Sequence, residues 1–112
     1  MSRRRKAPAG LLLTPGAGSG ADHHTLVAIE DAVRPLPVAR VDFPYRKEGR
    51  KAPDRAPKLM ASVVDDVTTL SAELDVAPGR LVLGGRSMGG RMCSMVVADG
   101  LPAAGLILIS YP

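Results

Sequence analysis

Short runs of apolar residues, each bounded by glycine or proline, most strongly constrain the fold of this chain. They cover residues 10–14, 80–84 and 105–110, and runs of this length with such boundaries predict buried β-strands. Residues 38–43 differ because apolar and polar side chains alternate there, which predicts a strand with one wetter face. We therefore expect four strands, with the alternating one at an edge of the sheet.

Helical periodicity fills the segments between these strands. Apolar residues three or four positions apart predict helices over residues 25–33, 56–75 and 89–99. Strands that alternate with helices favour a parallel sheet joined by right-handed crossovers. The predicted fold class is therefore α/β, with four parallel strands in the order 2-1-3-4 and helices on both faces.

Length and composition limit the kind of protein. With 112 residues, 46% of them hydrophobic, the chain can form one domain at most, and no run approaches the roughly 18 apolar residues of a membrane span. Cys93 is the only cysteine, which excludes an internal disulfide and favours a reducing, cytoplasmic location. The sequence predicts no cofactor and no metal site.

The net charge of +4 is concentrated in two segments. Residues 3–6 carry four positive charges, and residues 46–58 carry six basic against two acidic side chains, so the rest of the chain is acidic. Basic side chains at a terminus are usually solvated, and residues 1–9 are therefore predicted to form a basic flexible tail. We expect neither nucleic acid nor a membrane as a partner.

The pentapeptide Gly85-Arg86-Ser87-Met88-Gly89 follows a predicted strand and precedes a predicted helix. A serine on such a sharp turn needs small residues two positions before and after it, and Gly85 and Gly89 meet that need. The turn would hold the Ser87 hydroxyl clear of the sheet, at the positive end of the following helix. This context predicts a nucleophile elbow; the alternative is a glycine-rich turn that only allows close packing.

A second glycine-rich loop covers residues 15–20, directly after the first strand. In the strand order 2-1-3-4, strands one and three are neighbours, so the loops leaving their carboxyl ends lie side by side. The backbone N–H groups of Met88 and Ala17 can then converge on one oxygen atom. The two loops together predict a site for acyl chemistry.

Three parts of the chain carry a resemblance to a known family: residues 14–23, residues 43–45 with 49–54, and residues 84–91. Together they resemble a branch of the α/β-hydrolase superfamily. That branch groups dienelactone-hydrolase-like bacterial proteins with a subunit of the NSL histone-acetyltransferase complex.

This resemblance implies a serine hydrolase that acts on ester or other acyl bonds of a small-molecule substrate. It implies Ser87 as the nucleophile, with Gly16, Ala17 and Met88 around the oxyanion hole. It further implies that residues 10–112 form the N-terminal half of an α/β-hydrolase domain.

The acid and the histidine that complete a triad in this fold follow the serine in sequence. After Ser87 the chain contains one acidic residue, Asp99, and no histidine. Asp99 ends the helix after the elbow, where a surface charge is the expected role. His23 and His24 lie beside the predicted oxyanion hole, on the side of its donors, whereas a base is expected to approach from the opposite side; a base from this pair stays an alternative. We therefore expect an incomplete chain that lacks the triad acid and histidine and is nearly inactive alone.

Two other functions stay open at this point. Residues 16–21 fit the pattern Gly-x-Gly-x-x-Ala after a strand, and Asp42 follows where the ribose-binding acid of a dinucleotide-binding βαβ domain belongs. A non-catalytic interaction module of the same fold would explain the missing triad and the basic segment at residues 46–58. In an incomplete chain, the apolar strand at residues 106–110 would leave an unpaired edge, through which a homodimer could form.

Overall fold

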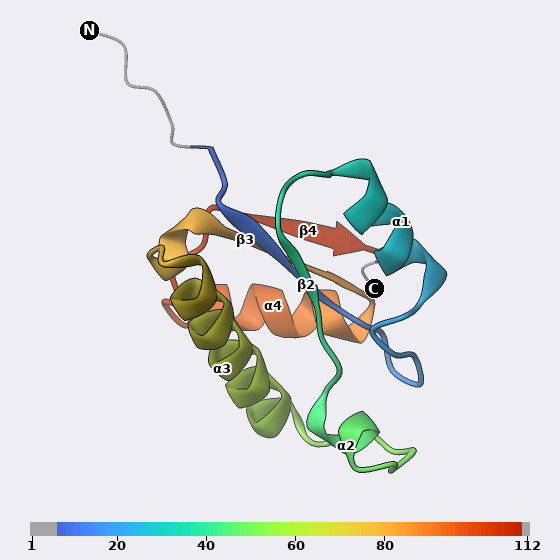
Figure 1. Ribbon diagram of the computed structural model, residues 1–112. Helices are drawn as coiled ribbons and strands as arrows, with labels where there is room; N and C mark the ends of the chain where they lie inside the picture. Colours follow the sequence, from blue (N-terminus) through green and yellow to red (C-terminus); the bar gives the residue numbers. More distant parts are fainter. Residues whose placement is uncertain (1–6, 111–112) are drawn as a thin grey trace, which may run out of the picture.

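Four parallel strands form the central sheet of the protein, whose computed structural model describes residues 7–110. Their order is β2-β1-β3-β4, and helices cover both faces of the sheet (Figure 1). The strands are β1 (Gly10–Thr14), β2 (Val38–Arg40), β3 (Leu81–Arg86) and β4 (Gly105–Ile109). The helices are α1 (His24–Ala32), α2 (Pro44–Lys47), α3 (Ala56–Leu74) and α4 (Met88–Ala98), with a short 3₁₀ turn at Pro78–Arg80. This arrangement confirms the predicted α/β class and strand order.

Two hydrophobic clusters, one on each face of the sheet, hold the helices in place. Helices α3 and α4 cover the face that carries Leu12 and Leu83. Helix α1 covers the other face, where Leu26 packs with Leu11 and Leu13. All five residues of β1 are buried, because a strand covered on both sides is apolar throughout instead of alternating. Burial of each such leucine stabilises the fold by roughly 1.5–3 kcal/mol.

Helix α3 shows how the sequence pattern becomes packing. Its buried residues include Leu59, Val63, Val67 and Leu70, whose spacing of four or three places them on one face of the helix. The helix ends where Asp75 takes a left-handed conformation with φ 53°, a common helix terminator. The predicted helix boundaries agree with those of α1, α3 and α4 to within one residue.

The segment after β2 differs from the prediction. The alternating pattern predicts a strand over residues 38–43, but β2 ends at Arg40 and α2 begins at Pro44. The N–H of Val41 still donates to the Leu13 carbonyl of β1 (3.0 Å), after which the chain turns away from the sheet. Proline is favoured in the first turn of a helix, yet a helix of a single turn has no apolar period to detect. The edge position predicted for this strand is confirmed.

Strand β4 forms the opposite edge of the sheet and consists of apolar residues and one glycine. Leu106 and Leu108 are 38% and 41% exposed, while Ile107 packs with the cluster under α1. The homodimer expected through this edge stays a prediction. Within residues 7–110, no helix combines the length and the apolar character needed to cross a membrane.

The basic tail predicted over residues 1–9 lies mostly outside the described residues. Its last part contacts the 3₁₀ turn: the Arg80 side chain donates to the Ala7 carbonyl (2.9 Å), and the Ala9 N–H donates to the Arg80 carbonyl (2.8 Å). The domain boundary expected at residue 10 stays a prediction.

Candidate active site

Ser87 lies on a strained turn between β3 and α4. Its backbone has φ 52° and ψ −112°, a conformation that costs a non-glycine residue on the order of 1–3 kcal/mol. The N–H of Ser87 donates to the Ile109 carbonyl of β4 (2.8 Å), and its own carbonyl accepts from the Arg91 N–H (3.0 Å). The turn therefore has the strand-to-helix geometry that the Gly-x-Ser-x-Gly motif predicts, and neighbouring elements fix it on both sides.

Gly85 and Gly89 allow the backbone to pass closely around this turn. A Cβ atom at Gly85 would collide with Thr14 Oγ1 and would lie 2.5 Å from the backbone of Gly89 and Gly90. A Cβ atom at Gly89 would lie 2.6 Å from the Pro15 carbonyl oxygen. Contacts this short do not occur in folded proteins, so glycine is required at both positions.

The glycine-rich loop after β1 lies directly against the elbow. A Cβ atom at Gly16 would be 3.5 Å from Ser87 Cβ and 3.4 Å from the Arg86 carbonyl oxygen. The N–H of the next residue, Ala17, makes no hydrogen bond within residues 7–110, and Met88 opens helix α4, where the first N–H groups have no intrahelical partner. The fold thus brings together the loops that carry the predicted site residues, with N–H groups available near Ser87.

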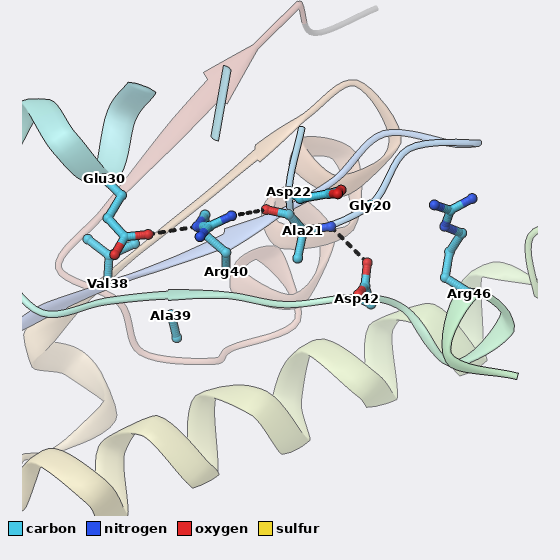
Figure 2. Close-up of a pocket in the computed structure, with 9 residues that line it drawn as sticks. All are labelled: Gly20, Ala21, Asp22, Glu30, Val38, Ala39, Arg40, Asp42 and Arg46. Carbon is cyan, nitrogen blue, oxygen red and sulfur yellow. Dashed lines mark hydrogen bonds and ion pairs between the residues drawn. The ribbon is translucent and has the colours of Figure 1, made fainter. Parts of the chain in front are cut away.

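Side chains from β2 and from the segment that follows it hold the end of the glycine-rich loop in place. Asp42 Oδ1 accepts from the Ala21 N–H (2.8 Å), and Arg40 donates to the Ala21 carbonyl (2.7 Å), as Figure 2 shows. The buried Tyr45 hydroxyl accepts from the Gly18 N–H (3.3 Å). Sequence reasoning did not assign these roles; the only signal was the polar character of positions 40 and 42 on the strand that ends at the sheet edge.

A cavity of about 700 Å³ lies behind this loop, along β2 (Figure 2). No residue of the elbow lines it; the lining residues are Gly20, Ala21, Asp22, Glu30, Val38, Ala39, Arg40, Asp42 and Arg46. Two of the charged lining groups form an ion pair, with Arg40 Nε 2.6 Å from Glu30 Oε1. Asp42, the residue that a dinucleotide-binding domain would use to bind a ribose, instead accepts the Ala21 N–H through Oδ1. The cavity therefore lies between the end of the glycine-rich loop and β2, is lined by charged side chains, and is separate from the space above Ser87.

His23 caps helix α1 and is not placed as a base. Its Nδ1 accepts a hydrogen bond from the Thr25 N–H (3.2 Å), so the neutral ring carries its proton on Nε2 and has no lone pair left for Ser87. Partial burial lowers the pKa of His23, and the positive charges of Arg86 and His24 lower it further. The His24 ring stacks on it, with centroids 4.3 Å apart.

Within residues 7–110, nothing completes a triad around Ser87. The Ser87 side chain does not cap its own helix, and it forms no hydrogen bond with a described histidine or acid. Asp99 is exposed at the far end of α4. Burial raises the pKa of the Cys93 thiol to about 11, so this neighbour is no alternative nucleophile. The described residues also contain no group of three His, Cys, Asp or Glu side chains placed to hold a metal ion.

A parallel sheet with a serine on a tight strand-to-helix turn, facing a glycine-rich loop, defines the class of α/β-hydrolase-like proteins. Comparison with protein families agrees: residues 7–112 match the model described as an alpha/beta hydrolase domain. The chain therefore belongs to the α/β-hydrolase domain family. No curated protein and no solved structure matches it.

Proposed function

We propose that this protein is a serine hydrolase that cleaves ester or other acyl bonds of a small molecule through Ser87. The observation that carries this proposal is the backbone of Ser87, held at φ 52° at the start of α4. Strain of this kind persists only when surrounding structure maintains it, and it concentrates at functional sites. A turn that served packing alone would have no need for a non-glycine residue at this position.

The roles of the other residues follow from their positions. The Ser87 hydroxyl attacks the acyl carbon, and the N–H groups of Met88 and Ala17 stabilise the oxyanion, with Gly16 allowing the substrate close to the backbone. Helix α4 contributes the positive end of its dipole at the same point. The reaction proposed here uses no cofactor and no metal ion.

Neither histidine of the chain has an interaction with Ser87 within residues 7–110 that would make it the base. His23 and His24 are the only histidines among the 112 residues, and the lone pair of His23 is engaged by Thr25. We propose that a base and an acid outside these residues act on Ser87. Without them the hydroxyl is a neutral alcohol and a poor nucleophile, and turnover should fall by about a million-fold relative to a complete triad.

The resemblance to dienelactone-hydrolase-like proteins supports a small acyl substrate and not a macromolecule. The family match is to the α/β-hydrolase domain as a whole, so this finer assignment is part of the proposal.

Covalent labelling with a fluorophosphonate tests the proposal directly. We expect slow modification of one residue, Ser87, found by intact mass and peptide mapping, and a faster reaction when imidazole is added to act as a base. Ser87→Ala should abolish labelling, whereas Ser94→Ala, on the same helix, should leave it unchanged.

Labelling that persists in Ser87→Ala, or a Ser87 that stays unmodified with imidazole at every concentration, would contradict the hydrolase proposal. The second result would favour a non-catalytic interaction module of the same fold.

A further inference from the structure

Arg86 immediately precedes the proposed nucleophile, and both residues lie next to Gly16. Arg86 is the last residue of β3. Side chains alternate between the two faces of a strand, so Arg86 lies on the same face as Val82, four residues earlier. Val82 packs in the hydrophobic cluster under α1. A Cβ atom at Gly16 would lie 3.4 Å from Arg86 Nη1 and 3.5 Å from Ser87 Cβ. The guanidinium and the serine therefore flank the same glycine of the loop that would receive the substrate.

The guanidinium of Arg86 has no counter-charge in the described part of the chain. The two other partly buried arginines of residues 7–110 have partners: Arg40 pairs with Glu30, and Arg80 donates to the Ala7 carbonyl. The Arg86 side chain forms no ion pair and no hydrogen bond within residues 7–110, although it is partly buried. Its positive charge reaches the start of α1, where it contributes to the lowered pKa of His23.

A partly buried guanidinium whose N–H groups meet no protein acceptor can donate them to a bound anion, and its low exposure strengthens that interaction relative to one in bulk water. Its planar fork fits a carboxylate in a bidentate manner, and such charge-assisted bonds are about twice as strong as neutral ones. Because the guanidinium and the serine both lie next to Gly16, one small molecule can place a carboxylate at Arg86 and its acyl group at Ser87.

We infer that Arg86 binds the carboxylate of an anionic substrate, a short ester with a free carboxylate a few bonds from its acyl carbon, and thereby selects it over neutral esters. This inference rests on the proposed function only for the position of the acyl group at Ser87. The carboxylate contact itself does not require Ser87 to react.

Binding of monoethyl succinate, followed by NMR through the backbone amides of Ala17 and Met88, tests this inference without any turnover. Saturable shifts are expected for the unmodified protein and for Ser87→Ala. Affinity should fall at least about tenfold in Arg86→Gln, as expected for loss of a charge-assisted hydrogen bond. Arg91→Gln is the matched control, since Arg91 is an exposed arginine on α4, and it should bind as the unmodified protein does.

Diethyl succinate supplies the same carbon chain without the charge and should show no dependence on Arg86. If Arg86→Gln does not fold, Arg86→Lys replaces it; with the charge kept and the fork lost, it should still bind more weakly than the unmodified protein. Equal binding of the monoester by unmodified protein and Arg86 variant, equal losses in Arg91→Gln, or no saturable shift at all would overturn the inference. Binding by Ser87→Ala together with failed fluorophosphonate labelling would instead retain the anion site and reject the hydrolase.

Discussion

The two loops that meet at the carboxyl end of the sheet are held by different means. The elbow around Ser87 is fixed by backbone hydrogen bonds to Ile109 and Arg91 and by the absence of side chains at Gly85 and Gly89. The glycine-rich loop is fixed by side chains that reach it from β2 and from the segment after it. The elbow thus depends on its own pentapeptide and its neighbours in the sheet, whereas the opposing loop depends on residues about twenty positions away.

Gly85→Ala should break the elbow and give the largest effect. The new Cβ atom would collide with Thr14 Oγ1 and lie 2.5 Å from the backbone at the start of α4, where no flexible side chain can give way. We expect a loss of about 3 kcal/mol in the free energy of unfolding, measured by urea denaturation. Gly105→Ala is the matched control, because a Cβ there meets nothing within 4 Å; equal losses in both variants would contradict the packing argument.

Asp42→Ala should loosen the opposite loop with a smaller loss, about 2 kcal/mol. It removes the charged acceptor of the Ala21 N–H (2.8 Å), and bonds to charged groups contribute roughly 1.5–3 kcal/mol. Amide hydrogen exchange at Ala21 should accelerate by more than the change in global stability explains.

Asp42→Asn separates the hydrogen bond from the charge, since its side-chain oxygen can still accept. It should retain more than half of the stability lost in Asp42→Ala, and Ala21 should stay protected. If the two variants behave alike, the charge of Asp42 matters for the loop and not its contact with Ala21.

Tyr45→Phe should have a still smaller effect, about 0.5–1 kcal/mol. The ring of Tyr45 is fully buried in the core and phenylalanine preserves it, so only the longer hydrogen bond to the Gly18 N–H (3.3 Å) is lost. Urea denaturation measures the loss, and exchange at Gly18 locates it. A loss as large as that of Asp42→Ala would mean that Tyr45 and not Asp42 is the main support of the loop.

The same contrast explains what the sequence could predict. The elbow was predictable because its glycines, its serine and the flanking strand and helix are adjacent in the chain, so one motif describes all of them. The strand order was predictable because the alternating pattern at residues 38–43 marks an edge strand, and the order follows from it. The contacts of Arg40, Asp42 and Tyr45 were not, because which loop a polar side chain reaches depends on where the chain leaves β2.

Arg86 shows the same limit at closer range. Its place beside Ser87 is visible in the sequence, and so is the possibility of an acidic substrate. That it lacks a counter-charge within residues 7–110 is not visible, because acidic residues are numerous there and only their positions in space show that none pairs with it.

His23 gives the smallest expected effect and links the start of α1 to Arg86. Its pKa is lowered from the ordinary value of 6.5, so below that value the unfolded chain binds a proton before the folded one does. The folded state therefore loses stability as the pH falls from the ordinary pKa toward the lowered one, and gains nothing above it. Melting temperatures measured from about pH 7.5 to about pH 5.5 should show this decrease.

His23→Asn removes the titrating ring but keeps an acceptor that caps helices well, so its melting temperature should change less over this range and match the unmodified protein's trend at higher pH. In Arg86→Gln the nearby positive charge is gone, and the pKa of His23, followed by NMR, should rise toward the ordinary value. If that pKa stays where it is in the unmodified protein, the guanidinium of Arg86 does not face the start of α1. The proposed anion site would then be exposed to solvent on the side of α1, and a carboxylate bound to Arg86 would be hydrated and weakly held.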